Sequence, residues 1–397
     1  MTITNINLYY RRQQYDKWEY DKRGRFDIMD FKKLGIFKEL VDILKKNGIS
    51  APTPIQEESI EIIKNGKDII AEAGTGTGKT LAFLLPIFEQ INPKSKDVQA
   101  LILTPTRELA LQITNEADKL NEDKKINVLA CYGGKDINSQ LKKLNKNVQL
   151  IVATPGRLLD HIERKTIDLK TVKIFVLDEA DQMLFMGFKN EVEKIMEQMS
   201  KKKQMLCFSA TMDSAVKKLA YRYMNDPAII SVKKEEVDMH SIKQFVVETT
   251  DRQKRDALCK VLDEDNPFMA IIFCRTKRRA DDLETVMATR KYNCAKIHSD
   301  IAQNKRERIM KSFREAKLQY LIATDVAARG LDITGVTHIY NYDIPETPES
   351  YVHRIGRTGR AGEKGITCMF VDPKNKRALE EIEDTIGFKI PRRSVEL

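Results

Sequence analysis

The amino-acid sequence predicts an α/β protein with two tandem domains, each built around a parallel β-sheet. Short apolar runs recur along the chain, and each is followed by turn residues and a polar, helix-like segment. Such runs are typical of parallel strands that are buried on both faces. The rhythm pauses between Pro227 and Thr250, where the charged stretch KKEEVD is typical of a linker. The chain has 397 residues, which is enough for two or three domains of about 100–200 residues each.

This pattern divides the chain into four segments. Residues 1–30 are a polar arm with aromatic residues, residues 31–232 the first domain, residues 233–241 the linker and residues 242–397 the second domain. A helix is expected from about Phe31, because apolar residues recur at i, i+3 and i+4, and Gly48 is expected to end it. The predicted strands of the first domain are DIIAEAG, ALILTPT, VLACYGG, LIVATPG, IFVLDEA and MLCFSAT, and those of the second are AIIFCRT, AKIHSD, YLIATD, HIYNYDIP and ITCMFV.

The amino-acid composition excludes several classes of protein and favours others. Hydrophobic residues make up 42% and charged residues 32% of the chain, which argues against disorder. The six cysteines form no CxxC pair, so neither a disulfide scaffold nor a cysteine-bound metal is expected. The sequence shows neither an apolar run of the roughly 18–20 residues that a membrane helix needs nor a secretory signal, so we expect a cytoplasmic protein with no membrane partner. The net charge of +10 favours polyanionic partners, mainly nucleic acid.

A glycine-rich segment in the first domain predicts a phosphate-binding loop. Residues 73–80 read Ala-Gly-Thr-Gly-Thr-Gly-Lys-Thr and stand between a predicted strand and a predicted helix. Glycines let backbone N–H groups approach phosphate oxygens, and the helix N-terminus adds a positive dipole end. Lys79 is expected to reach the β- and γ-phosphates, and the Thr80 hydroxyl to bind Mg²⁺. Ala73 departs from the usual GxxxxGK[ST] pattern, and a plain glycine-rich turn is the alternative.

An acidic segment follows a later strand of the same domain. Residues 178–181 read Asp-Glu-Ala-Asp after the apolar run KIFVL. A carboxylate at a strand end can hold Mg²⁺, usually through water, and Asp178 fits this role. Glu179 is expected to orient or deprotonate the attacking water. A solvated acidic turn is the alternative, and it loses weight because a phosphate loop is predicted in the same domain.

The ordered set of short motifs resembles the DEAD-box RNA helicases. Residues 178–181 carry the namesake motif, GISAPTPIQ at 48–56 looks like the adenine-sensing Q motif with Phe31 upstream, and residues 73–80 match the AxTGxGKT loop of the family. The further matches are PTRELA at 105–110, Gly133-Gly134, TPGR at 154–157, Ser209-Ala210-Thr211, IIFCRT at 271–276, Gln303 with Arg306, ATDVAARGLDI at 323–333 and HRIGRTGR at 353–360. A single short match often occurs by chance, but the ordered set of matches is specific to the family.

The resemblance implies a role for each matching position. Gln56 would bind the adenine edge, and Ile49 stands where the family often has an aromatic residue beside adenine. The implied ATP-binding set is Ile49, Gln56, Ala73, Gly74, Thr75, Gly76, Thr77, Gly78, Lys79, Thr80 and Asp332, the last reaching the ribose. The implied catalytic set is Lys79, Asp178, Glu179, Arg357 and Arg360, and Thr80 with Asp178 would hold Mg²⁺ largely through water.

The remaining implied roles are coupling and RNA binding. Asp181, Ser209, Thr211 and His353 would link hydrolysis to work on RNA. The set that would grip the RNA sugar-phosphate backbone is Pro105, Thr106, Arg107, Gly133, Gly134, Thr154, Pro155, Gly156, Arg157, Arg275, Gln303, Arg306, Thr324 and Arg329. Contacts to the backbone carry no sequence information, so sequence-independent activity is expected. From spacing alone, the arginines at 354, 357 and 360 are equally consistent with a solvated helix stripe and with arginine fingers.

Together, the residues and the resemblance predict an ATP-dependent RNA helicase of two RecA-like domains, with ATP and RNA bound at the cleft between them. The expected cofactors are ATP and Mg²⁺, and the expected partner is single-stranded RNA or a short duplex. We expect a monomer, with ribosome-assembly or RNA-decay proteins as candidate partners. An ATP-gated RNA clamp or scaffold has the same motifs and stays open, and unwinding assays would separate it. A DNA helicase or translocase is a second alternative, and comparing RNA with DNA as activator of ATP hydrolysis would separate it.

Overall fold

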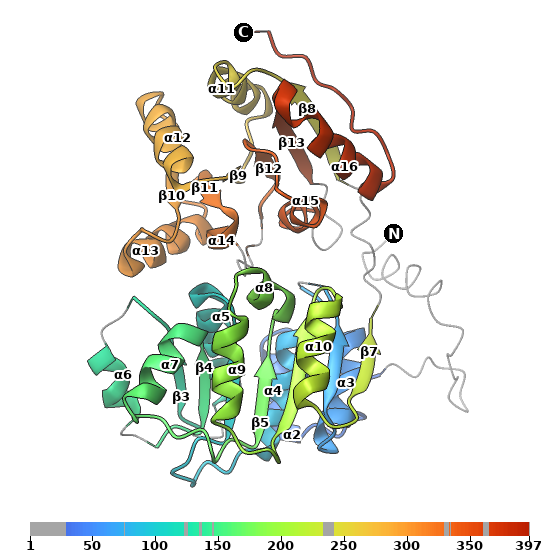
Figure 1. Ribbon diagram of the computed structural model, residues 1–397, viewed down its shortest axis with the longest axis vertical. Helices are drawn as coiled ribbons and strands as arrows, with labels where there is room; N and C mark the ends of the chain where they lie inside the picture. The colour runs from blue at the N-terminus through green and yellow to red at the C-terminus, as the bar shows by residue number, and fades with distance from the viewer. Residues whose placement is uncertain are drawn as a thin grey trace.

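The computed structural model describes residues 29–74, 76–122, 126–134, 137–144, 147–232, 242–328, 333, 335–359 and 365–396 (Figure 1). Residues 1–28 of the predicted arm and the predicted linker lie outside these residues. So do the predicted site residues Thr75, Arg329, Asp332 and Arg360.

The described residues form two parallel sheets, which define domain 1 and domain 2 and confirm the predicted fold class. The sheet of domain 1 has seven strands in the order β3-β4-β2-β5-β6-β1-β7. Its strands are β1 (Ile69–Glu72), β2 (Ala100–Leu103), β3 (Val128–Cys131), β4 (Leu150–Ala153), β5 (Ile174–Leu177), β6 (Gln204–Ser209) and β7 (Ala228–Ser231). Its helices are α2 (Lys38–Lys46), α3 (Pro54–Lys64), α4 (Lys79–Gln90), α5 (Arg107–Leu120), α6 (Ile137–Leu144), α7 (Pro155–Glu163), α8 (Ala180–Phe185), α9 (Lys189–Glu197) and α10 (Ser214–Tyr223).

Domain 2 repeats the architecture with a six-stranded sheet in the order β10-β11-β9-β12-β13-β8. Its strands are β8 (Lys243–Glu248), β9 (Ala270–Cys274), β10 (Cys294–Ile297), β11 (Tyr320–Thr324), β12 (His338–Asn341) and β13 (Ile366–Val371). Its helices are α11 (Lys254–Asp265), α12 (Lys277–Thr289), α13 (Gln303–Arg314), α14 (Asp325–Ala328), α15 (Pro348–Ile355), η2 (Pro373–Asn375) and α16 (Lys376–Ile386).

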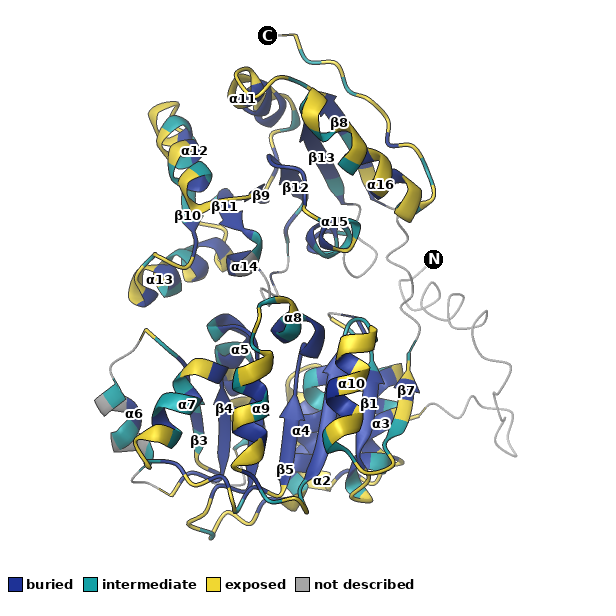
Figure 2. Cartoon of the chain, in the orientation of Figure 1, coloured by how far each residue is buried: buried dark blue, intermediate teal, exposed yellow. Residues whose placement is uncertain are grey.

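The apolar runs form strands because helices cover both faces of each sheet. Alternate residues of β1 enter different cores: Ile69 and Ala71 join one cluster and Ile70 the other. The inner strands, such as β2, β4, β5 and β11, are accordingly buried along their length (Figure 2). Burial on both faces requires continuous apolar sequence, which is the pattern that predicted them.

Three local expectations need correction. The first helix begins at Lys38, and Phe31 instead begins a turn that ends at Gly35, whose φ is +69°. The strands β7 and β8 lie in the stretch where the strand rhythm pauses, and the sequence did not predict them. Both are edge strands, and Ile229 of β7 is 67% exposed, so neither needs a continuous apolar run.

The parallel register brings the carboxyl ends of the strands to one edge of each sheet. In domain 1, Leu103 at the end of β2 pairs with Leu177 of β5, which pairs with Cys207 of β6. The residues that follow these strands therefore share one edge, where ligands bind in open α/β sheets. In Figure 1, α5 and α8 of domain 1 lie on the side that faces α13, α14 and α15 of domain 2. No helix of the described residues is long and apolar enough to cross a membrane.

Candidate nucleotide and RNA site

The phosphate loop connects β1 to the N-terminus of α4. Lys79 is the first residue of α4, and its Nζ donates to the Ala73 carbonyl at 2.9 Å. The Thr77 hydroxyl donates to the Gly74 carbonyl at 2.8 Å. Gly78 has φ +95°, and a Cβ there would lie 2.5 Å from Nε2 of Gln56. Only glycine fits this position, because both the backbone conformation and the neighbouring amide exclude a side chain.

Gln56 ties the Q-motif segment to this loop. Its Oε1 accepts a hydrogen bond from the Thr53 amide at 2.9 Å, and its Nε2 donates to the Gly78 carbonyl at 2.9 Å. The side chain is buried. The contact with Gly78 connects any change at Gln56 to the phosphate loop. Ile49 packs against the neighbouring apolar core, partly buried.

The acidic segment gathers buried carboxylates at the end of β5. Asp178, Glu179 and Asp181 are all buried, and Asp178 Oδ1 accepts a bond from the Glu179 amide at 3.0 Å. Oε2 of Glu179 and Oδ1 of Asp181 are buried without a hydrogen-bond partner. Glu179 has a left-handed backbone with φ +51°, which is uncommon outside glycine. Such unpartnered, buried acceptors are costly unless a ligand or water satisfies them.

Burial and neighbouring charges set the protonation of these groups. Burial first, and then the nearby Asp178 charge, raise the pKa of Glu179 to about 7, whereas Lys79 and Arg357 oppose the rise. Burial also raises the pKa of Asp178, and Lys79 lowers it. Oxygen ligands of this kind suit Mg²⁺. Among the described residues no three His, Cys, Asp or Glu side chains group closely enough to hold a metal alone, so Mg²⁺ would depend on Thr80, Asp178, water and phosphate.

The residues of domain 1 with a predicted coupling role contact one another. The Asp181 amide donates to Oγ of Ser209 at 3.2 Å, and the Thr211 hydroxyl donates to Oδ2 of Asp181 at 3.5 Å. The Ser209 carbonyl also accepts the Ala73 amide at 2.9 Å. The end of β6 is therefore bonded both to the acidic segment and to the phosphate loop. His353 lies on α15 and lines a small pocket with Arg354 and Arg357.

The arginines of domain 2 do not share one helix face. The helix α15 ends at Ile355, so Arg354 lies on it and Arg357 lies in the following turn. Arg354 is buried, which excludes the solvated stripe for this residue. Its guanidinium donates to both carboxylate oxygens of Asp325, at 2.6 and 2.7 Å, and also to Oδ1 of Asn341 and to the Asp343 carbonyl. Nothing in the local sequence predicts this set of bonds.

The RNA motifs of domain 1 cluster around Arg107. Thr106 caps α5 by accepting the Leu109 amide at 3.3 Å. A Cβ on Gly134, whose φ is +88°, would lie 2.5 Å from Nη1 of Arg107, so the guanidinium lies directly against this glycine. Nearby, Arg157 lies in the first turns of α7, 3.7 Å from Asp160. The structure places the other predicted residues as follows: Pro105 just after β2, Gly133 beside Arg107, and Thr154, Pro155 and Gly156 at the start of α7.

Two predicted RNA-binding residues of domain 2 contact domain 1. Nη1 of Arg107 donates to Oε1 of Gln303 at 3.4 Å, and Nη2 of Arg306 pairs with Oε1 of Glu108 at 2.5 Å. Glu108 was not predicted as a site residue, because nothing local marks it as the partner of a distant arginine. Of the other domain 2 residues predicted to bind RNA, Arg275 donates to Oδ2 of Asp343 through its amide and to the Ile344 carbonyl through Nη2, and Thr324 ends β11, buried.

These features define a class of protein: a two-domain nucleoside triphosphatase whose phosphate loop and buried carboxylates face arginines of a second domain. The comparisons specify the class further. Residues 53–219 match the sequence model of the DEAD/DEAH box helicases, and residues 253–362 match that of the helicase conserved C-terminal domain. The chain belongs to the DEAD-box ATP-dependent RNA helicase family.

Relatives and solved structures support this assignment. The chain is 48% identical over 355 residues to the ATP-dependent RNA helicase CshA of Listeria monocytogenes, covering 89% of this chain and 68% of the relative. It is 47% identical over 362 residues to the DEAD-box ATP-dependent RNA helicase CshA of Bacillus subtilis, covering 91% and 73%. Dbp5 of S. cerevisiae bound to RNA and ADP BeF3 matches with a TM-score of 0.84 at 33% identity, covering 92% of this chain and 95% of that chain. Mss116p bound to ssRNA and AMP-PNP also gives 0.84, at 31% identity, covering 95% and 81%.

Proposed function

We propose that this helicase separates short RNA duplexes by ATP-driven closure of its two domains, and that hydrolysis resets the cycle. The observation that carries the proposal is the pair of buried carboxylate oxygens without hydrogen-bond partners, Oε2 of Glu179 and Oδ1 of Asp181, together with the charges of Lys79 and of Arg357 of domain 2 that act on Glu179. Neither domain alone holds all of these groups. Catalysis at this site therefore depends on the contact between the domains.

The chemistry needs positioning and charge neutralisation more than covalent catalysis. Lys79 and the loop amides would hold the phosphates, and Glu179 would take the proton of the attacking water. Arg357, with Arg360, would neutralise charge that develops on the transferred phosphoryl group. Mg²⁺, held by Thr80 and Asp178 largely through water, would supply further positive charge at the phosphates. Gln56 and Ile49 would contact the base, and Asp332 the ribose.

Closure would link the nucleotide to RNA through the shared contacts of Ser209. Its carbonyl binds the phosphate loop at Ala73, and its hydroxyl binds Asp181. With Thr211 and His353, this chain of contacts would report the state of the nucleotide to the domain boundary. Two ligands that both prefer the closed form would then stabilise it together. The remaining predicted RNA residues would grip the backbone without reading its sequence.

The arrangement of the domains supports the closed form as the RNA-bound one. The TM-score is 0.84 to a point variant of Dbp5 bound to RNA and ADP BeF3, but 0.61 to the same variant bound to Nup159, a Gle1 variant, IP6 and ADP. The sequence identities are nearly equal, 33% and 31%, so a difference in the arrangement of two similarly folded domains would account for the gap. The higher score to the RNA-bound relative supports a closed arrangement of the domains in this chain.

ATP turnover without nucleic acid, with single-stranded RNA and with matched DNA tests the proposal. We expect strong stimulation by RNA only, because the family relies on contacts to RNA, whose 2′-hydroxyls DNA lacks. Glu179→Gln should lower turnover by about 10²–10⁴-fold and trap the RNA-bound form, because a general base contributes about this much. Equal stimulation by DNA would support a translocase instead. Stimulation without multiple-turnover unwinding of a short duplex would leave an RNA clamp.

A further inference from the structure

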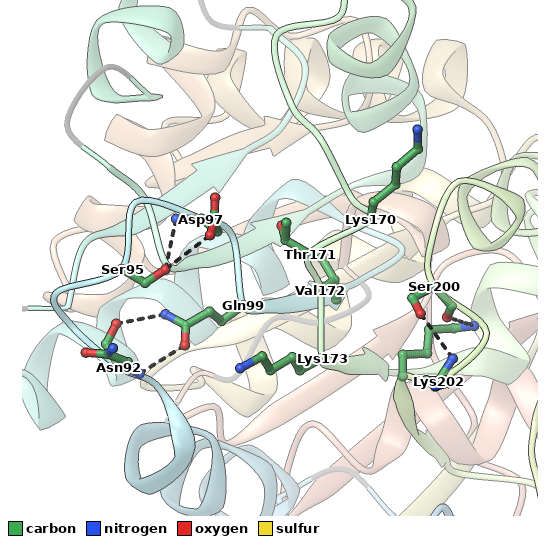
Figure 3. A pocket seen from close by; sticks show the side chains of 11 residues that line it. Asn92, Ser95, Asp97, Gln99, Lys170, Thr171, Val172, Lys173, Ser200 and Lys202 are labelled. Carbon is green, nitrogen blue, oxygen red and sulfur yellow. Dashed lines mark hydrogen bonds between the residues drawn. The ribbon is translucent and has the colours of Figure 1, made fainter.

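A lysine-rich pocket lies at the amino edge of the sheet of domain 1, opposite the candidate site (Figure 3). Three loops form it, and they lead into β2, β5 and β6. The cavity measures about 370 Å³. Its lining includes Lys170, Lys173, Lys202 and Lys203, and no aromatic residue of the described chain lines it.

The charge of these loops is unusually one-sided. Residues 92–99, 170–173 and 200–203 carry seven lysines and one carboxylate, Asp97. The seven are Lys94, Lys96, Lys170, Lys173, Lys201, Lys202 and Lys203. None of them has a carboxylate within ion-pair distance among the described residues, as the ion pairs of domain 1 involve other lysines and arginines. These three segments together carry a net charge of +6, against a net charge of +10 for the whole chain.

The matching edge of domain 2 shows that the fold does not require this charge. There the loops 266–269, 315–319 and 335–337 lead into β9, β11 and β12. They carry only Glu315 and Lys317, which pair with each other at 2.6 Å. The basic edge is therefore a property of domain 1, not of parallel sheets in general.

The pocket has a rigid floor and one partly desolvated cation. Gln99 bonds Asn92 twice, accepting its amide at 3.0 Å and donating to its carbonyl at 2.8 Å (Figure 3). Lys203 is half-buried, and its Nζ donates only weakly, at 3.5 Å, to the Ser200 carbonyl. Burial lowers the pKa of Lys203, and the Asp68 charge opposes this. A bound anion would relieve the cost of keeping this ammonium charged.

We propose that the lysine pocket is a second contact site for the phosphate backbone of RNA, used by RNA that extends beyond the cleft. The inference rests on the proposed RNA-binding function. Lysines neutralise phosphates as point charges, and without aromatic side chains the pocket offers no base stacking. Strands of four residues separate the two edges, and at a rise of about 3.3 Å per residue this is roughly 13 Å. Only an RNA longer than the cleft needs can contact both.

Binding of a short and a long RNA to the full chain tests this site. The probes are oligo(U) of about 8 and about 40 nucleotides with a non-hydrolysable ATP analogue, titrated between about 50 and 200 mM salt. The variant Lys170→Ala/Lys173→Ala/Lys202→Ala removes three exposed lysines. We expect the affinity for the long RNA to fall about tenfold and its salt slope to fall by about 2, since each lost phosphate contact removes about 0.7 for single strands. The affinity for the short RNA should stay unchanged.

A matched control separates this site from general charge loss. Lys189→Ala/Lys260→Ala/Lys376→Ala removes the same charge from exposed positions elsewhere. An equal loss of long-RNA affinity in both variants would overturn the proposal. No loss in the pocket variant would also overturn it, and would leave an acidic protein as the occupant of the pocket. If the wild-type chain binds neither RNA, the proposed function itself fails. Short-RNA binding by the pocket variant reports that it is folded.

Discussion

The carboxyl edges of the two domains differ in how their buried charged groups are hydrogen-bonded. Domain 1 leaves Oε2 of Glu179 and Oδ1 of Asp181 buried without partners. In domain 2, by contrast, the buried guanidinium of Arg354 makes four hydrogen bonds, two of them to Asp325. Both edges contain predicted site residues, so we interpret the difference in hydrogen bonding as a difference in what each edge does.

This difference indicates how the two domains divide the work. Buried groups without partners cost stability, and they persist where a ligand completes them. Domain 1 therefore has the groups of a binding pocket, whereas domain 2 presents Arg357 from the turn after α15, next to the hydrogen-bonded Arg354. Substitutions at the domain 1 edge should change ligand chemistry. Substitutions of Arg354 or of its hydrogen-bond partners in domain 2 should change stability.

The largest expected effect belongs to Arg357, which connects the two edges. Arg357→Ala should lower RNA-stimulated ATP turnover by about 10³–10⁵-fold, the usual contribution of an arginine finger. The KM for ATP should change little, because Lys79 and Gln56 of domain 1 remain. Steady-state turnover at saturating RNA measures both. Arg314→Ala, at an exposed position of the same domain, is the control, and a loss below about tenfold for Arg357→Ala would remove it from catalysis.

The next prediction distinguishes the structural role of Arg354 from the catalytic role of Arg357. Arg354→Ala should destabilise domain 2 by about 3–5 kcal/mol, because it removes a buried guanidinium and leaves the partly buried carboxylate of Asp325 and the carbonyl of Asp343 without their donor. Chemical denaturation monitored in domain 2 measures this loss, and ATP binding by domain 1 should survive it. The exposed pair of Arg164 and Asp160 in domain 1 has a similar distance, 2.6 Å, yet Arg164→Ala should have no measurable effect. If Arg354→Ala is fully stable but inactive, Arg354 acts in catalysis instead.

The third effect concerns the contact between the domains. Glu108 and Arg306 are both buried and lie 2.5 Å apart across the boundary. A double-mutant cycle with Glu108→Gln and Arg306→Gln should give a coupling energy of about 1–3 kcal/mol in RNA binding with a bound ATP analogue. The same cycle without nucleotide should give no coupling if the pair forms only in the closed form. Additive effects in both states would show that Arg306 acts on RNA alone.

How far the sequence predicted these two edges depends on whether the signal is local. The phosphate loop and the acidic segment were predicted because strand, loop and helix follow one another within a few residues. The edge strands β7 and β8 were not, because they are not buried on both faces. The pairing of Arg306 with Glu108 requires the arrangement of the domains, which no local pattern contains. Arg354 was grouped with Arg357 by spacing, but the helix ends between them, so one side chain turns inward.

The smallest expected effect is a pH dependence of domain 1 that comes from a buried histidine. His161 on α7 is fully buried, and its ring contacts Oγ1 of Thr166 at 2.8 Å and Oε1 of Gln140 at 3.0 Å. Gln140 in turn donates to the Tyr132 carbonyl at 3.0 Å, just before the Gly133 loop. The histidine therefore connects α7 and α6 behind two of the predicted RNA motifs.

Burial lowers the pKa of His161, the charges of Arg157 and Arg164 act in the same direction, and Asp160 opposes them. The unfolded chain, with an ordinary pKa of about 6.5, then binds a proton before the folded chain does. The stability contribution is therefore fully present above about pH 6.5 and is lost as the pH falls below it. Between about pH 7.5 and 5.5, the free energy of opening of α6 and α7 should fall by about 1 kcal/mol.

Hydrogen exchange of the amides of α6 and α7, compared between variant and wild type at each pH, measures this loss. His161→Gln removes the titrating group, so its opening free energy should depend less on pH than that of the wild type. The control is His338→Gln in domain 2, where burial also lowers the histidine pKa, and it should leave α6 and α7 unchanged. If the pH dependence of the wild type persists in His161→Gln, the effect comes from the carboxylates of domain 1. The pH response of the two domains would then differ through their acidic residues rather than through their histidines.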